Sequence, residues 1–300
     1  MSPCRGEVVA GGLVVVDKAS GMTSHDVVSR LRRLLRIRRI GHAGTLDPMA
    51  TGVLVCGVGR ATKLLGHLPL EPKVYRGTVR LGMSTTTDDA QGECTGGADA
   101  SAVSESQIRA ALAGLRGTIE QVPSTVSAVK IGGKRAYALA RAGTQVLLAA
   151  RPVTVSRFEL LALRRGHTVT DLDVLVECSG GTYVRALARD LGATLSVGGH
   201  LTALRRTRVG PYGLDIARSL DELASAPGLS AGLDEVVTAL FPHRAVDSRQ
   251  ARVLAHGGSL PAGGLAGTYA AIDSGGGAVA LLAEREGQAH PVLVLHPAGE

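Results

Sequence analysis

The chain has few aromatic residues, few lysines and no paired cysteines. Its 300 residues include no Trp, two Phe and five Tyr, so Val, Leu, Ile and Ala must build the core. Its four cysteines show no CxxC spacing and no Cys/His cluster, which argues against a zinc site and a disulfide framework. No apolar run approaches the roughly 18 residues that span a membrane, and the N-terminus has no signal-peptide pattern. We therefore expect a soluble, cytoplasmic protein with reduced thiols and no membrane partner.

Positive charge is the main compositional feature that the chain does have. Basic residues number 33 against 26 acidic ones, which gives a net charge of +7 and a pI near 9.6. Arginine accounts for 28 of the basic residues, and its guanidinium suits bidentate contacts with phosphate. This balance is compatible with a nucleic-acid partner, although many basic proteins bind none.

Strand and helix patterns mix irregularly along the first 240 residues. Apolar or alternating segments predict strands at 12–18, 74–82, 152–163, 170–178 and 200–210. Amphipathic segments predict a helix that begins near Thr23 or Ser24 and further helices at 106–117, 182–195 and 234–240. Residues 84–104 are small and polar and predict a loop, and 122–143 begins irregularly and ends in a short helix. This mixture predicts an α/β (α+β) sheet domain rather than regular βαβ repeats.

The composition of the sequence and the spacing of its apolar segments change near residue 240. Short apolar pieces separated by glycines follow, as in TYAAID, GGAVALLAEREG and HPVLVLHP. Their spacing predicts a small all-β module of about 60 residues. We therefore predict two domains, 1–240 and 241–300.

The segment GHAGTLDPMATGVLV (41–55) places one carboxylate in a stiff loop. Asp47 precedes Pro48, which disfavours the helical conformation at Asp47. Gly41, Gly44 and Gly52 indicate tight turns around it. Two interpretations stay open on these residues alone: the carboxylate satisfies nearby N–H groups in an Asx-type turn, or it serves a reaction.

Four other side chains stand at positions where a site could form. Tyr183 and Arg185 follow a tight turn at the start of a helix, where the arginine could pair with a distant carboxylate. Lys18 ends the first predicted strand. Tyr75 lies on the apolar face of its strand, either as a core residue or as a platform on which a base stacks.

Five segments in order resemble one known family. They are GHAGTLDPMATGVLVCGVGRATK (41–63), KVYRGTVRLG (73–82), VPSTVSAVKIGGKRAY (122–137), SGGTYVRALARDLG (179–192) and HLTALRRTRVGPY (200–212). Together they resemble the TruB family of bacterial tRNA pseudouridine-55 synthases, from residue 12 to about 215. The C-terminal module falls where this family carries a small RNA-binding domain of the PUA type. The resemblance thus implies a mixed-sheet pseudouridine synthase domain followed by a PUA-like domain.

The resemblance implies that the protein isomerises the uridine at position 55 in the T loop of tRNA. The N-glycosidic bond breaks, the uracil turns, and a C–C bond forms. Asp47 then corresponds to the essential carboxylate, which either attacks the ribose or removes a ribose proton to give a glycal; the sequence does not choose between them. A hydrolytic glycosidase usually needs two carboxylates, and the 41–63 segment contains only one. The resemblance implies no metal and no organic cofactor.

Other roles carry over by resemblance to residues of the same segments. Tyr75 would stack on the target base, Arg185 would pair with Asp47 and keep it ionised, and Tyr183 would lie near the base. His42 would enter the space that the flipped base leaves, although a locally bonded loop histidine is the alternative. Lys18 and Lys63 would contact phosphate or ribose. Residues 120–148 would form an insertion that clamps the RNA, with Val126 where many relatives have an aromatic residue.

The expected partner is the T-arm stem-loop of tRNA, bound by a monomer. The arginines between residues 30 and 39, with Arg205, Arg206 and Arg208, would line the RNA backbone, where contacts set affinity rather than base choice. Two alternatives remain: a non-catalytic tRNA-binding or tRNA-folding chaperone, and a relative of the guide-RNA-dependent pseudouridine synthases.

Overall fold

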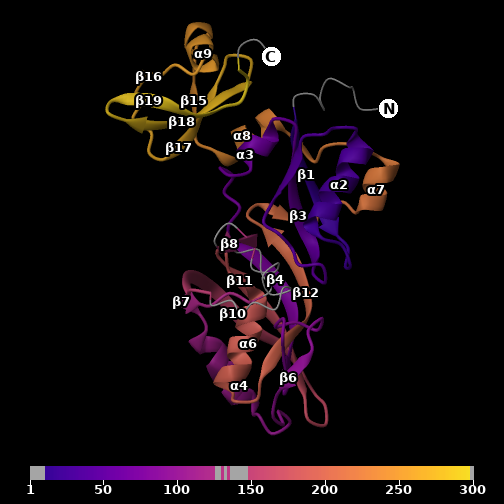
Figure 1. Cartoon of the computed structure of the whole chain (residues 1–300). Coiled ribbons are helices and arrows are strands. Elements are labelled where there is room, and N and C mark those ends of the chain that lie inside the picture. The colour runs from indigo at the N-terminus through magenta and orange to yellow at the C-terminus, as the bar shows by residue number, and fades with distance from the viewer. Residues whose placement is uncertain (1–10, 126–129, 132–133, 136–147, 298–300) are drawn as a thin grey trace. The chain divides into compact units, whose positions relative to one another are not determined.

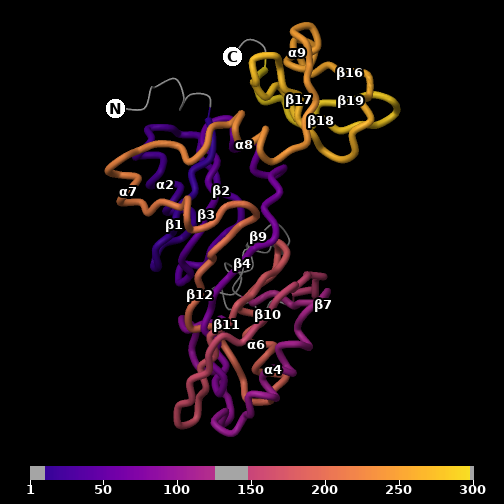
Figure 2. Tube along the Cα trace, turned by 180° about the vertical axis from the view of Figure 1, so that it is seen from behind, coloured from indigo at the N-terminus to yellow at the C-terminus, as the bar shows by residue number. Residues whose placement is uncertain are grey.

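The chain folds into two compact units that share one strand. The computed structural model describes residues 11–125, 130–131, 134–135 and 148–297 (Figures 1 and 2). The first unit comprises Met1–Asp47, Leu54–Pro69 and Leu214–Glu300, and the second comprises Pro48–Val53 and Leu70–Gly213. Strand β3 (Thr51–Val58) begins in the second unit and ends in the first. No helix of the described residues combines the length and apolarity that crossing a bilayer requires.

The N-terminal part of the first unit is built on a buried strand and an amphipathic helix. Leu13 to Val16 of β1 (Gly12–Lys18) are fully buried, as the β-branched run predicts. Thr23 caps α2 (Ser24–Leu35) and forms a capping box with Asp26. The helix ends at Arg36, which adopts the left-handed conformation with φ 55°. Also in this part are β2 (Ile40–Ala43), α3 (Ala61–Leu64), α7 (Leu220–Ser225), β14 (Ala231–Gly232) and α8 (Leu233–Leu240).

Residues 214–240 complete this part of the first unit from the far end of the sequence. Strand β14 pairs with β1, and α7 packs beside α2 (Figure 1). The main-chain N–H of Arg218 donates to the carbonyl of Val15, and the N–H of Asp17 donates to the carbonyl of Arg218. The buried strand near the N-terminus therefore needs partners from beyond residue 213.

The C-terminal residues form a five-stranded sheet around a small core. The strand order is β15–β17–β18–β19–β16, and Tyr269 and Leu282 are fully buried in it. The predicted β-sheet is confirmed, and residues 248–255 form a helix in addition, because Asp247 and Gln250 make a capping box. The domain boundary at 240 stays a prediction. The elements are β15 (His243–Ala245), α9 (Ser248–Ala255), β16 (Leu260–Pro261), β17 (Thr268–Ile272), β18 (Ala278–Arg285) and β19 (Gln288–Val294).

The second unit is a mixed sheet with two helices. Its strand order is β3–β12–β4–β11–β10–β7, with β12 parallel to β3 and antiparallel to β4. Leu172, Val174 and Val176 of β11 are fully buried, as their alternation predicts. Helices α4 and α6 pack on each other and on the sheet. The elements are β4 (Lys73–Leu81), α4 (Glu105–Gly114), β7 (Gly117–Gln121), β10 (Arg151–Arg165), β11 (Thr170–Cys178), α6 (Val184–Thr194), β12 (Gly199–Val209) and β13 (Tyr212–Gly213).

Two segments of the second unit differ from the sequence prediction. The predicted loop 84–104 contains the short pair β5 (Ser84–Thr85) and β6 (Cys94–Gly96). Helix α4 ends at Gly114 instead of Gly117, because Gly117 has φ 87° and begins β7. Within the predicted insertion the structure describes residues up to 125 and the backbone of β8 (Lys130–Ile131) and β9 (Lys134–Arg135). The predicted short helix ending at Gly143 and the departure at Val126 lie outside the described residues.

Gly52 allows β3 and β12 to pair, and replacing it is expected to destabilise the protein. A Cβ on Gly52 would lie 2.1 Å from the main-chain oxygen of Arg206, and Gly52 has φ 101°. We expect Gly52→Ala to lower the free energy of unfolding by more than about 2 kcal/mol, measured by urea denaturation. Gly66→Ala is the matched control, since a Cβ there meets nothing within 4 Å. Equal urea midpoints for the two variants would contradict this prediction.

Candidate active site

The loop that carries Asp47 is fastened to the first turn of α2. The main-chain N–H of Leu46 donates to Ser24 Oγ over 2.9 Å, and Ser24 Oγ donates back to the Leu46 carbonyl over 3.3 Å. Gly44 takes a positive φ of 77°, as the sequence predicts for a tight turn. Leu46 and Ser24 are buried, whereas Asp47 is half-buried. This anchoring places a partly accessible carboxylate directly after a fixed residue.

The other candidates of the first unit occupy different environments. His42 lies on β2 opposite Cys56 of β3 and is half-buried. Lys18 is 0% exposed, and its Nζ donates to the carbonyls of Ala19 and Met22 over 2.9 and 2.7 Å. A phosphate contact would require this ammonium to leave the turn after β1. Lys63 is exposed on α3, so its predicted contact needs no such change.

Tyr75 and Arg206 face each other across neighbouring strands of the second unit. They are register partners on β4 and β12, and the Arg206 guanidinium carbon lies 6.0 Å from the centre of the Tyr75 ring. Arg206 Nε donates to the Val53 carbonyl over 2.7 Å. A buried guanidinium at this distance attracts the ring face through the ring quadrupole. Arg206 therefore holds one side of Tyr75.

The position of Arg206 differs from the predicted RNA-lining surface. Its side chain is 1% exposed, so it does not present its charge to an RNA backbone in this conformation. A β-bulge between Arg206 and Arg208 turns Arg208 outward, where it is exposed. Arg205 is half-buried and donates to Thr51 Oγ1 over 3.3 Å.

Gln121 fixes the start of α6 at Tyr183. The Tyr183 N–H donates to Gln121 Oε1 over 2.8 Å, and Gln121 Nε2 donates to the Tyr183 carbonyl over 3.1 Å. Tyr183 is the N-cap residue, in extended conformation. Gln121 thus satisfies the main-chain N–H of the N-cap residue and fixes the backbone where the chain enters α6.

Arg185 is buried with a carboxylate that sequence analysis did not single out. Its Nη1 donates to the Thr87 carbonyl over 2.8 Å and lies 3.5 Å from Asp89 Oδ2, with side chains 4% and 5% exposed. Asp89 Oδ1 also accepts from Thr87 Oγ1 and from the Gln91 N–H, over 2.6 and 3.0 Å. Both charges are therefore compensated by opposite charge and hydrogen bonds, as buried charges must be. The predicted pairing of Arg185 with Asp47 stays a prediction.

The missed residues lie in the polar loop 84–104, to which the sequence suggested no role. Asp88 and Asp89 are a carboxylate doublet, and α6 carries two arginines four positions apart. The second arginine, Arg189, binds Asp88 Oδ2 over 3.3 Å and the Val122 carbonyl over 2.8 Å. Asp88 and Arg189 are 101 positions apart in the sequence, so the pairing arises only from the fold.

A partly buried polar cluster joins the start of β4 to the turn before α6. Glu71 Oε1 accepts from the Gly180 N–H over 2.6 Å. Desolvation, together with the nearby Arg206 charge, lowers the pKa of Lys73. Burial raises the pKa of the Cys178 thiol to about 11, so this thiol stays protonated. The cluster connects the two segments that present Tyr75 and Tyr183.

Within the residues that the structure describes, no group of three or more His, Cys, Asp or Glu is arranged to hold a metal ion. The chemistry that the described residues offer is that of a carboxylate, two tyrosines and buried arginines. Asp47 lies in the first unit, and Tyr75, Tyr183 and Arg185 lie in the second.

Comparison with protein families gives consecutive matches along the chain. The model described as "TruB family pseudouridylate synthase (N terminal domain)" matches residues 32–184. The model of the "tRNA pseudouridylate synthase B C-terminal domain" matches 185–240, and that of "tRNA Pseudouridine synthase II, C terminal" matches 241–296.

Curated relatives match over nearly the whole length. A protein of Nocardia farcinica named tRNA pseudouridine synthase B is 61% identical over 99% of this chain and 97% of its own. Proteins of the same name from Rhodococcus jostii and Mycobacterium tuberculosis are 57% and 56% identical, over 97% and 96% of this chain and 96% of each relative.

Solved structures share the fold at low identity. A Cbf5–Nop10–Gar1 complex contains a chain that is 24% identical with a TM-score of 0.73, over 98% of this chain and 88% of that one. A chain of an H/ACA RNP bound to a substrate RNA is 22% identical with a TM-score of 0.71, over 97% and 87%. At this identity the likeness concerns the fold alone.

Proposed function

Because the chain belongs to the TruB family of pseudouridylate synthases, we propose that it isomerises the T-loop uridine at position 55 of tRNA. The protein is a tRNA pseudouridine synthase, an isomerase whose substrate is tRNA. The observation that carries this function is the 61% identity over 99% of the chain to a relative of that name. The choice of position 55 rests on the five segments that resemble the family.

In the proposed reaction the bond between C1′ and N1 breaks and a bond between C1′ and C5 forms. N1 ends with a proton, and the proton on C5 leaves to solvent. Asp47 either bonds to the ribose or removes a ribose proton, and its anchored loop suits both roles, since each needs a fixed carboxylate. No water attacks, so a second catalytic carboxylate is not required.

The remaining residues are assigned supporting roles. Tyr75, held on one side by Arg206, stacks on the base, and Arg185 pairs with Asp47. Tyr183 lies near the base. His42 fills the space that the flipped base leaves. Lys63, Arg205 and Arg208 contact the RNA backbone. Lys18 holds the turn after β1, and Arg206 holds the Tyr75 ring.

We propose that the protein is a cytoplasmic monomer in which one domain catalyses the reaction and the other binds RNA. Residues 1–240 carry the reaction, and 241–300, a PUA-like module, add RNA contacts. Residues 120–148 clamp the T arm. The exposed Arg249 and Arg252 of α9 supply positive charge to the module.

Tritium release from a T-arm stem-loop labelled with [5-³H]uridine tests the function. Isomerisation frees the tritium on C5, so the protein should release it without any guide RNA. A tRNA-binding chaperone would bind the stem-loop and release none. Release only after a guide RNA is added would favour the guide-dependent alternative over a stand-alone enzyme.

A further inference from the structure

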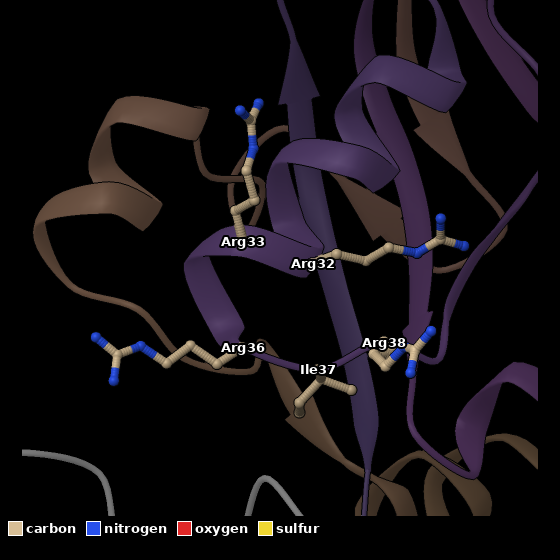
Figure 3. Close-up of a pocket in the computed structure, with 5 residues that line it drawn as sticks. All are labelled: Arg32, Arg33, Arg36, Ile37 and Arg38. Carbon is tan, nitrogen blue, oxygen red and sulfur yellow. The ribbon is translucent and has the colours of Figure 1, made fainter.

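Four arginines line an open hollow at the C-terminal end of α2. The hollow has a volume of about 620 Å³ and is lined by Arg32, Arg33, Arg36, Ile37 and Arg38 (Figure 3). All four arginine side chains are exposed. Arg32 Nη2 donates to the Ile40 carbonyl over 3.0 Å. Across the ranges that the structure describes, no hydrogen bond or ion pair engages the guanidinium groups of Arg33, Arg36 and Arg38.

This arrangement is unfavourable for the folded chain alone. Four like charges around one hollow repel each other, and the partial negative charge at the C-terminus of α2 offsets only part of that repulsion. Arg36 adds backbone strain, because it occupies the left-handed position at which glycine is usual. A charged residue in a strained backbone position that usually holds glycine indicates a functional role for its side chain.

The hollow and Asp47 lie toward opposite ends of the same helix. Ser24, the first residue of α2, holds the loop of Asp47, and Arg36 follows its last residue. The helix has 12 residues, and at about 1.5 Å per residue it is about 18 Å long. A ligand in the hollow is therefore too far away to be the reacting nucleotide, but within reach of the same RNA molecule.

We propose that this arginine hollow, at the end of α2 opposite the loop of Asp47, binds backbone phosphates of the RNA. The inference rests on the proposed tRNA substrate and names a second point of attachment for it. Arginine forks match phosphate oxygens in pairs. The site adds affinity and salt dependence and does not take part in the chemistry.

Binding of a tRNA transcript at several salt concentrations tests the proposal. For the double variant Arg36→Gly/Arg38→Ala we expect about tenfold weaker binding near 0.1 M salt. The slope of log affinity against log salt should fall by about 1.5, the contribution of two phosphate contacts. The control is Arg109→Ala/Arg157→Ala, which removes the same charge from arginines already paired with Glu105 and Glu159. A slope equal to that of the wild type, or a loss equal to that of the control, would overturn the proposal.

Further measurements show which phosphates of the RNA the hollow binds and whether the backbone strain at Arg36 serves binding. If the double variant binds both a T-arm hairpin and whole tRNA more weakly, the hollow contacts phosphates of that arm. If it binds only whole tRNA more weakly, the hollow contacts phosphates outside the arm. Both outcomes support the proposal. A variant that loses binding of inorganic pyrophosphate but keeps the tRNA salt slope overturns it. Arg36→Gly alone should raise the melting temperature while weakening tRNA binding; a lower melting temperature with unchanged binding would make Arg36 structural.

The two proposals fail in different ways. The control variant Arg109→Ala/Arg157→Ala should release tritium at the wild-type rate. A wild type that binds tRNA through the hollow yet releases no tritium would defeat the proposed function and leave the binding result intact.

Discussion

Asp47→Asn is expected to abolish tritium release while leaving tRNA binding nearly unchanged. The amide has the size of the carboxylate but neither attacks a ribose carbon nor takes up its proton. A loss of at least about a thousandfold in turnover is expected for a group that carries the bond-making step. The loop should keep its shape, because the bonds between Ser24 and Leu46 do not involve Asp47. Single-turnover tritium release and filter binding on the same tRNA measure the two effects.

The control for Asp47→Asn is Asp99→Asn. Asp99 is exposed and accepts a hydrogen bond from the Ser101 N–H, which is the local arrangement that an Asx-type turn provides. Its replacement should change neither binding nor turnover. An Asp47→Asn protein that forms pseudouridine at a normal rate would remove Asp47 from the reaction.

The second large effect is expected at the buried pair of Arg185 and Asp89. Asp89→Asn removes the carboxylate that lies 3.5 Å from the Arg185 guanidinium, in a pair whose side chains are 4% and 5% exposed. Breaking a buried pair in this way costs about 3 kcal/mol of stability or more. Arg185 also loses its fixed position, for which a turnover loss of about a hundredfold is expected. Urea denaturation and tritium release at saturating tRNA measure the two quantities.

Glu105→Gln is the matched control for Asp89→Asn. It removes the partner of Arg109 in an exposed pair four residues apart on α4, for which about 0.5 kcal/mol or less is expected. If Asp89→Asn lowered stability but kept normal turnover, the pair would hold the loop 86–89 without positioning Arg185 for the reaction. Normal stability and normal turnover together would show that the pair contributes nothing measurable.

The sequence predicted those elements whose signals lie close together along the chain. The alternation of Leu172, Val174 and Val176 predicted β11, and Thr23 with Asp26 predicted the start of α2, because each pattern spans a few residues. The helix α9 was missed although Asp247 and Gln250 have the spacing of a capping box. The glycine-separated apolar pieces after residue 257 indicated strands, and the capping-box spacing before them was overlooked.

The missed parts of the site depend on contacts between distant segments. Arg185 and Asp89 come together only when α6 packs against the loop after β5, so no local pattern reveals the pair. The β-bulge after Arg206 depends on the register between β12 and β4. Simple alternation puts Arg206 and Arg208 on one face, whereas the bulge buries the first and exposes the second.

The division of the chain between its two units sets an order in which they can form during synthesis. The second unit lies entirely within residues 48–213, so the ribosome completes it first. The first unit must wait for α7 and β14, which supply the partners of α2 and β1. Until then Leu13 to Val16, fully buried in the finished protein, lack their final cover. The nascent chain therefore emerges with this apolar strand exposed, the condition under which chaperones bind.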